Sequence, residues 1–358
     1  MQGKVLIVGA SGLVGTQACQ SFIDAGWSVI AASRRYPDLV HGEFEHLHLD
    51  IMSQAACEGA LQQHPDITHL VYTAVFELPG LMPGWSDPLQ IKTNDAMLRN
   101  VLAPLIAHGN LAHVSLLQGT KAYGASVRPM RVPARESQPR VEHPNFYWLQ
   151  EDFLLQAASR HGFSHTILRP QLIVGPNHGV VMNLPPVIGA YAALRRAEGK
   201  PFSFPGGADW VWEAVDARLV GNACLWAASS PAARSQTYNL TNGEVFLWRD
   251  MWPALADTLG VTVGDDEPVD IAEYMQRHEE TWQQIVARHD LAPIPLKSLV
   301  GESHHYANLC FGYGADQPPP PTFVSTVKIK QHGFTETMNS EESFCFWLED
   351  LRRRRVIP

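Results

Sequence analysis

The most constraining feature of the chain is the segment Lys4–Gly15, KVLIVGASGLVG, in which a β-branched run breaks into three regularly spaced glycines. Apolar residues recur at helical spacing over residues 13–25, so the glycines fall at a strand-to-helix turn. Gly9 permits a tight turn, Gly12 lets backbone approach a ligand closely, and Gly15 lets the helix pack on the sheet. Because N–H groups and the helix dipole at such a turn favour phosphate, the segment predicts a dinucleotide site. The alternative is a glycine-rich loop of some other α/β domain.

The spacing G-x-x-G-x-x-G resembles that of the extended and atypical short-chain dehydrogenases/reductases. The next predicted strand, WSVIAASRR, ends on Ser33, Arg34 and Arg35, at the place where an acidic residue would bind the ribose 2′-hydroxyl of NAD. A hydroxyl and two guanidinium groups instead suit a 2′-phosphate, through charge-assisted bonds. The sequence therefore predicts NADP(H) rather than NAD(H), against the alternative that these arginines only decorate a loop. Asp50, after the third strand, is expected against the adenine.

Strands and helices alternate through the first half of the chain. The predicted strands are KVLIVGA, SVIAASR, FEHLHLD, THLVYTA, HVSLLQG and HTILRPQLIVG. Such alternation is typical of an α/β Rossmann fold, a doubly wound parallel sheet that binds ligands at the carboxyl ends of its strands. We predict an NADP-binding core over residues 1–180 and a smaller, mostly helical C-terminal substrate-binding lobe over 181–358, of which about 205–245 return to the core.

The lobe is expected to contain helices over residues 186–198 and 270–291. FSFPGG is predicted as a turn-rich strand, and residues 236–260 as a strand, a turn at Asn242-Gly243, a second strand and a helix. Pro318–Pro321 predicts an extended connector of polyproline II type.

Composition narrows the classes of partner. The formal net charge of −9 argues against nucleic acid or an anionic membrane as the main partner. Five scattered cysteines without a C-x-x-C motif predict neither a zinc site nor a disulfide framework, and suggest a reducing cytoplasm. No histidine pair has a convincing metal-binding context, and no apolar stretch approaches the 18 residues of a membrane span. We expect a small-molecule partner and no metal; a homodimer is compatible with these features, which do not specify the oligomeric state.

The catalytic question depends on an absent motif. Most short-chain dehydrogenases pair tyrosine with a lysine four residues later, which lowers the pKa of the phenol. None of the nine tyrosines here has a lysine four residues later. At that position after Tyr147 the chain has Glu151. This argues against an ordinary member and against nucleotide-sugar epimerases. Two other segments offer a substitute: SLLQGTKAYG, with Lys121, and NFYWLQED, with Tyr147 at the opening of a helix.

These two segments resemble the G-x-K-x-Y-x-G loop and the NFYY-x-x-ED helix of the progesterone 5β-reductase/iridoid synthase-like family of atypical short-chain reductases. Gly124 comes one position early, and Trp148 replaces the second tyrosine of the helix motif. The resemblance extends over essentially the whole chain, through residues 94–101, Arg169-Pro170, 182–184, 238–246 and 356–358.

The resemblance implies an NADPH-dependent reductase of the C=C bond of enones, by 1,4-hydride addition, with Δ4-3-ketosteroids among the candidate substrates. Tyr147 and Lys121 would be the catalytic residues that stabilise the enolate. Two alternatives stay open: a carbonyl reductase that uses Tyr147 as its acid, and a protein that senses NADP without turnover. Taken singly, Tyr147 could be a buried structural tyrosine and Lys121 a surface cation.

The remaining expected contacts follow from the same resemblance and from the glycine turn. The expected cofactor-binding residues are Gly9, Ser11, Gly12, Leu13, Val14, Gly15, Ser33, Arg34, Arg35, Asp50, Ile51, Thr73, Ala74, Val75, Gln118, Lys121, Tyr147, Pro170 and Ile173. The apolar enone is expected to contact Val75, Phe76, Tyr147, Met182 and Phe344, with the helix from Asp270 as a further wall. A phenylalanine at helical spacing, such as Phe344, is as readily explained by a place in the core.

Overall fold

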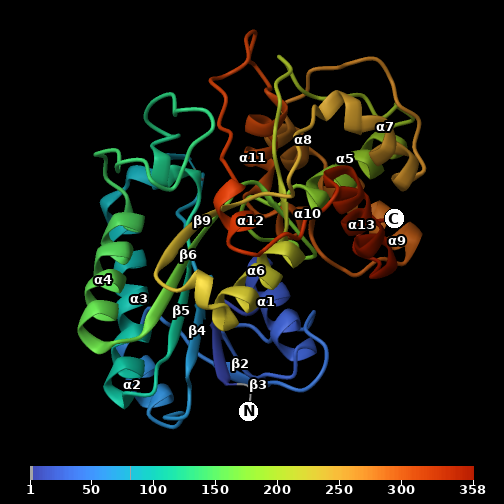
Figure 1. Ribbon diagram of the computed structural model, residues 1–358. Helices are drawn as coiled ribbons and strands as arrows, with labels where there is room; N and C mark the ends of the chain where they lie inside the picture. Colours follow the sequence, from blue (N-terminus) through green and yellow to red (C-terminus); the bar gives the residue numbers. More distant parts are fainter. Residues whose placement is uncertain (1–2, 81) are drawn as a thin grey trace.

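A parallel sheet of seven strands forms the centre of the computed structural model, which describes residues 3–80 and 82–358 (Figure 1). The strand order is β3-β2-β1-β4-β5-β6-β9, and every neighbouring pair is parallel. The strands are β1 (Lys4–Val8), β2 (Ser28–Ser33), β3 (Glu45–His48), β4 (His69–Tyr72), β5 (His113–Leu117), β6 (Ser164–Pro170) and β9 (Gln236–Leu240). The order reverses between β1 and β4, which creates a crevice at their carboxyl ends. The predicted Rossmann fold is confirmed.

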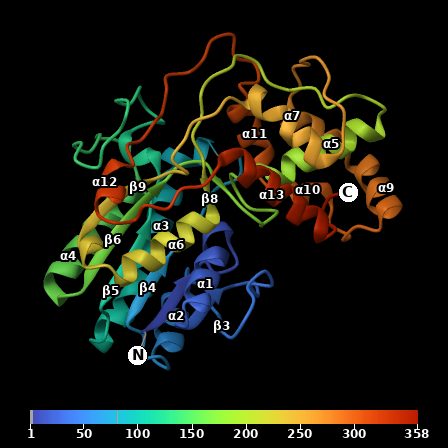
Figure 2. The same ribbon diagram turned by 45° about the vertical axis from the view of Figure 1, so that its right-hand side comes forward.

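Helices cover both faces of this sheet (Figure 2). Val5 and Ile7 of β1 pack with the helices of one face, whereas Leu6 and Val8 pack with those of the other, as the alternation of a strand requires. The first face carries α1 (Leu13–Asp24), α6 (Ala217–Ser229) and α12 (Val327–Gln331). The second carries α2 (Gln54–Leu61), α3 (Pro88–His108) and α4 (Phe146–His161).

A separate helical core lies beyond the carboxyl ends of the strands. Trp248 and Trp252 are among its largest buried side chains, and they pack against Phe311 with ring centroids 5.0 and 5.6 Å apart. The helices of this lobe are α5 (Pro185–Ala197), α7 (Trp248–Leu259), α8 (Ile271–Arg277), α9 (Glu279–His289), α10 (Leu296–Val300), α11 (Ser303–Phe311) and α13 (Ser340–Arg353). The described helices include none with the length and apolar character that crossing a membrane requires.

Four predicted elements differ from the structure. HTILRPQLIVG is not one strand, because Leu172 adopts a φ of 41° and separates β6 from β7 (Ile173–Val174), which pairs with β8 (Val215–Asp216). The predicted helix over 270–291 breaks at His278, whose φ of −113° is not helical, into α8 and α9.

The predicted strands in FSFPGG and after Asn242-Gly243 are also wrong. Phe202 and Phe246 each form only an isolated bridge, with Val263 and Trp212 respectively. Phe202 is buried in the helical core, and Phe246 packs against it. Apolar residues of both segments pack among the helices of the lobe, and within residues 3–80 and 82–358 neither segment pairs with a neighbouring strand beyond its single bridge.

Candidate active site

A cavity of about 1030 Å³ opens at the carboxyl ends of the central strands, between the sheet and the helical lobe. The glycine turn after β1, the end of β2, the loops after β4 and β5, and the start of α4 all contribute to its walls. The cavity thus lies where the strand order reverses, the usual ligand position in this architecture.

The glycine turn fits a dinucleotide pyrophosphate. Gly9 has a φ of +87°, which favours glycine, and Gly12 donates its N–H to the carbonyl of Gly9 at 2.9 Å. A Cβ on Gly15 would lie 2.1 Å from the Gly9 carbonyl oxygen, so α1 approaches the turn as closely as backbone allows. Gly12 caps α1 without a side-chain hydrogen bond, and Leu13 and Val14 of its first turn line the cavity. The helix N-terminus therefore presents N–H groups and a positive dipole end to the cavity.

The end of β2 presents two cations to the same cavity. Arg34 and Arg35 are exposed and lie on its wall. Ser33 is buried, and its hydroxyl donates to the carbonyl of Arg35 at 2.5 Å. The Ser33 hydroxyl proton is thus engaged within the protein, so Ser33 shapes the turn and the two guanidinium groups are left to meet a phosphate.

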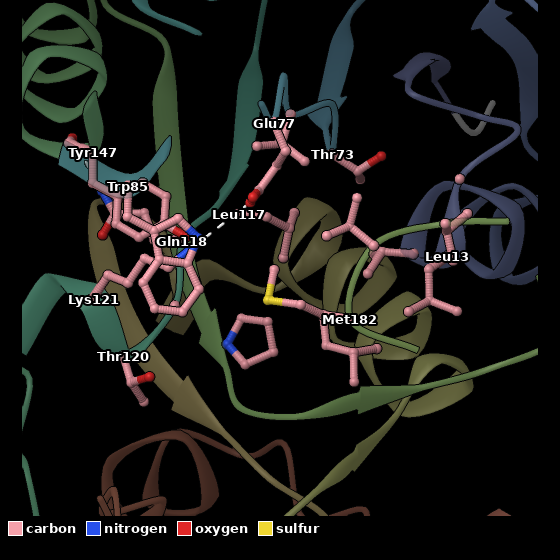
Figure 3. A pocket seen from close by; sticks show the side chains of 18 of the residues that line it. Leu13, Thr73, Glu77, Trp85, Leu117, Gln118, Thr120, Lys121, Tyr147 and Met182 are labelled. Carbon is pink, nitrogen blue, oxygen red and sulfur yellow. Dashed lines mark hydrogen bonds and ion pairs between the residues drawn. The ribbon is translucent and has the colours of Figure 1, made fainter. Parts of the chain in front are cut away.

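Asn145 connects the two segments that carry the expected catalytic side chains. Its Oδ1 accepts from the N–H of Tyr147 at 3.0 Å and caps α4, while its Nδ2 donates to the carbonyl of Lys121 at 3.2 Å. Tyr147 and Lys121 consequently lie on one wall of the cavity (Figure 3). Gly119 lies beside the Tyr147 hydroxyl, since a Cβ on this residue would be 3.4 Å from that oxygen.

A buried polar network fixes α4 against β5 and β6. Gln118 donates from Nε2 to the carbonyl of Tyr147 at 3.3 Å and to Glu151 Oε2 at 3.0 Å. Arg169, only 5% exposed, donates to Gln118 Oε1 at 2.9 Å and to Glu151 Oε2 at 3.2 Å. Glu151, four residues after Tyr147, is thus a structural anchor at the position where an ordinary short-chain dehydrogenase would have a lysine.

Lys121 has a partner that sequence reasoning missed. Its Nζ lies 3.7 Å from Oε1 of Glu77, in the loop after β4, and 3.7 Å from the ring centre of Trp85 (Figure 3). Burial lowers the pKa of Lys121 to about 8, and the carboxylate of Glu77 opposes that shift. Burial raises the pKa of Tyr147, and the negative charge of Glu77 raises it further. The Tyr147 phenol therefore keeps its proton at neutral pH.

The structure places nearly all the predicted site residues around this one cavity. Those that line it are Gly9, Ser11, Gly12, Leu13, Val14, Ser33, Arg34, Arg35, Asp50, Ile51, Thr73, Ala74, Val75, Phe76, Gln118, Lys121, Tyr147, Pro170, Ile173 and Met182. Gly15 is buried behind the turn and acts through packing.

The structure corrects the expected contact between Phe344 and the substrate, because Phe344 does not line the cavity. Its side chain is fully buried in the lobe, with its ring centroid 5.2 Å from Trp248 and 6.1 Å from Phe246. The helix from Asp270 was expected as a further wall, but neither α8 nor α9 lines the cavity; Tyr306 and Leu309 of α11 take that place. Helical spacing identified an apolar face but not the partner on which it packs.

Several wall residues escaped sequence reasoning. They are Glu77, Trp85, Trp210, Trp212, Tyr306, Leu309, the loop 125–130 and the strap 319–322. Glu77 had a usable signal, because an acidic residue soon after a buried strand belongs to the carboxyl edge of the sheet. The others come from the lobe or from irregular loops. In the part of the chain that the structure describes, no group of three or more His, Cys, Asp or Glu side chains could hold a metal ion.

The fold and the cavity define a Rossmann enzyme that uses a nicotinamide dinucleotide. A model of the NAD dependent epimerase/dehydratase family matches residues 5–241. The chain belongs to this family.

Curated relatives match the chain over nearly its whole length. The chain is 31% identical to (S)-8-oxocitronellyl enol synthase of Antirrhinum majus, over 100% of this chain and 93% of that protein, and 30% identical to the enzyme of the same name from Catharanthus roseus, over 99% and 92%. These relatives confirm the resemblance to the progesterone 5β-reductase/iridoid synthase-like family.

Solved structures share the architecture at lower identity. UDP-glucose 4-epimerase from Thermotoga maritima superposes with a TM-score of 0.68 at 17% identity, covering 98% of this chain and 99% of the epimerase. The Thermus thermophilus UDP-glucose 4-epimerase gives 0.66 at 17% identity, covering 98% and 99%. This likeness concerns the fold.

Proposed function

We propose that the chain is an NADPH-dependent reductase of the C=C bond of α,β-unsaturated carbonyl compounds. The observation that carries the proposal is that Tyr147 and Lys121, from two separate segments, line the same cavity as the glycine turn and the arginine pair. The relatives' name, an enol synthase, describes the product that 1,4-addition gives before the enol becomes a carbonyl.

Different residues of the cavity wall would bind the cofactor and the substrate. The glycine turn would hold the pyrophosphate, and Arg34 and Arg35 would bind a 2′-phosphate, which supports NADPH over NADH. When bound, the reduced nicotinamide supplies the hydride that adds to the β-carbon of the substrate. Val75, Phe76 and Met182 offer apolar contacts that suit the hydrocarbon part of an enone.

Tyr147 would donate a hydrogen bond to the substrate carbonyl oxygen as negative charge develops there. Its raised pKa suits this role, because the phenol remains protonated and is a poor base. One preorganised donor of this kind contributes about 3–4 kcal/mol to the transition state. The Lys121 ammonium adds positive charge to the same wall of the cavity.

The test is NADPH oxidation with 2-cyclohexen-1-one and progesterone, with products identified by mass spectrometry. We expect a saturated ketone, and a fall in kcat of about 100- to 1000-fold for Tyr147→Phe with NADPH affinity unchanged. Tyr313→Phe is the matched control, since Tyr313 is exposed and outside the cavity wall. An allylic alcohol as the product would instead establish a carbonyl reductase. Tight NADPH binding without turnover of any enone would contradict the proposal and favour a sensor of NADP.

A further inference from the structure

Glu77 is a buried carboxyl group in the cavity wall, beside the expected catalytic lysine. Its side chain is 4% exposed and that of Lys121 15% exposed, with 3.7 Å between Glu77 Oε1 and Lys121 Nζ (Figure 3). Burial raises the pKa of the Glu77 carboxyl group and the charge of Lys121 opposes that shift, so the ion pair depends on a structure that holds both partners in place.

The loop that carries Glu77 is held on both sides of this residue. Asn94 accepts from the N–H of Phe76 and donates to its carbonyl, both at 2.8 Å. Gln90 accepts from the N–H of Leu78 at 2.8 Å, and Glu302 of the lobe accepts from the N–H of Gly80 at 2.9 Å. Buried side chains of α3 and a carboxylate of the lobe therefore determine where the Glu77 carboxyl group lies.

Trp85 is a second partner of the Lys121 side chain. The Lys121 ammonium lies over the indole ring, 3.7 Å from its centre, within the range of a cation–π contact. Such a contact favours the charged form of the amine, as the carboxylate of Glu77 does. Together they offset part of the desolvation, which favours the neutral amine and remains the largest effect on the Lys121 pKa.

Few other titratable groups act on Lys121. Tyr147 shares its wall of the cavity and keeps its proton, while Arg169 is engaged by Gln118 and Glu151. The remaining charged residues of the cavity wall are Arg34, Arg35, Asp50 and Arg128. Glu77 is the one carboxylate whose charge opposes the lowering of the Lys121 pKa.

We propose that Glu77 is a positioning residue of the reduction, which keeps the Lys121 side chain charged and held at the wall where the substrate carbonyl binds. This inference rests on the proposed enone reductase function. It assigns no proton transfer to Glu77: the carboxylate acts through the lysine.

Glu77→Gln tests the proposal, because the amide has the same shape without the charge. The Lys121 pKa of about 8 already includes the raising influence of the Glu77 carboxylate, so loss of that carboxylate should lower the Lys121 pKa further. The alkaline limb of the pH profile of kcat/KM should therefore shift to lower pH by about one unit or more. The KM for NADPH should stay unchanged. Glu77→Asp, which retains the charge, should restore much of the wild-type profile.

Glu142→Gln is the matched control. Glu142 is exposed and lies outside the cavity wall, so this variant loses one carboxylate elsewhere in the chain and the alkaline limb should not move. Thermal denaturation and NADPH titration establish that each variant is folded. If Glu77→Gln does not fold, Glu77→Asp provides the test. Because this variant retains the charge, the alkaline limb of its kcat/KM profile should stay near the wild-type position.

A second readout separates this proposal from the proposed function. Reductive 13C-methylation followed by NMR reports the pKa of Lys121 without any turnover, and Lys121→Met assigns its resonance. A lower Lys121 pKa in Glu77→Gln supports the inference even where no enone is reduced. An unchanged pKa and an unchanged pH profile in that variant, with the wild type active, would overturn it while leaving the enone reductase function intact.

Discussion

Tyr147 works in surroundings opposite to those of the tyrosine in ordinary short-chain dehydrogenases. There a lysine one helical turn away makes the phenol more acidic, whereas here Glu151 takes that position and is bound by Arg169 and Arg140. Burial and the charge of Glu77 raise the Tyr147 pKa instead. A tyrosine in this state donates a hydrogen bond to an oxyanion and is poorly suited to abstract a proton from an alcohol.

Arg34 and Arg35 are expected to decide between the two nicotinamide cofactors. Replacement of both by alanine removes charge-assisted bonds to the 2′-phosphate, each contributing about 1.5–3 kcal/mol. We expect the Kd for NADPH to rise at least about 100-fold, with the Kd for NADH changing by less than about threefold, as measured by fluorescence titration. An equal loss of affinity for both cofactors would mean that these arginines do not contact the 2′-phosphate.

Among the elements, α1 shows how closely backbone geometry is tied to binding. The helix starts directly after the glycine turn, and its packing leaves no space for a side chain at Gly15, where a Cβ would lie 2.1 Å from the Gly9 carbonyl oxygen. Such an overlap involves backbone on both sides, so no rotamer change relieves it. The N–H groups of the first turn and the close approach of the helix therefore depend on the same residue.

A pair of glycine substitutions tests this. Gly15→Ala should lower the free energy of unfolding by about 1–3 kcal/mol through overpacking and weaken NADPH binding at least tenfold, because the turn must move. Gly59→Ala in α2 is the control: a Cβ there meets nothing within 4 Å, and alanine should stabilise the helix by about 0.5–1 kcal/mol. Urea denaturation and NADPH titration measure both. Wild-type affinity in Gly15→Ala would show that the turn tolerates the displacement.

Across the whole molecule, the cavity is closed by segments that are distant in sequence. The connection between α11 and α12 brings residues 319–322 to the cavity wall (Figure 1). Gln171 donates to the Thr322 carbonyl at 2.9 Å, and Glu213 accepts from the N–H of Val324 at 2.7 Å. Ala134 bridges to Val324 from a third part of the chain. The proline-rich connector is thus fastened to the sheet side of the molecule.

The contribution of Glu213, which binds this connector, to the stability of the folded protein depends on pH. Burial raises the pKa of Glu213 to about 7, although the N–H of Val324 opposes that shift. Between about pH 4.5 and pH 7 the folded protein holds a proton on this group that the unfolded chain has lost, so its contribution to stability falls as the pH rises. Glu213→Gln should remove that decline, as seen by the melting temperature across this range. The exposed Glu142→Gln is the control, and an unchanged decline in Glu213→Gln would assign it to other groups.

Much of the Rossmann half was predictable because its signals are local. Each predicted strand there is a short buried run next to a turn, and the glycine turn, Ser33, Arg34 and Arg35 follow their strands directly. Lys121 and Tyr147 were found for the same reason, since each lies within a short contiguous motif. Neighbours along the chain determine such features, so they can be recognised without knowledge of the tertiary contacts.

The packing of the lobe and the partners of Lys121 and Tyr147 could not be inferred in this way. The apolar face of α13 was visible in the sequence, yet whether Phe344 met a ligand or Trp248 depended on how the lobe helices pack. Glu77 and Lys121 are 44 positions apart in the chain, and Glu302, which holds the Glu77 loop, is more than 200 positions beyond that loop. Burial, and with it the shifted pKa values of the site, results from bringing such distant segments together. Local propensity carries no information about those encounters.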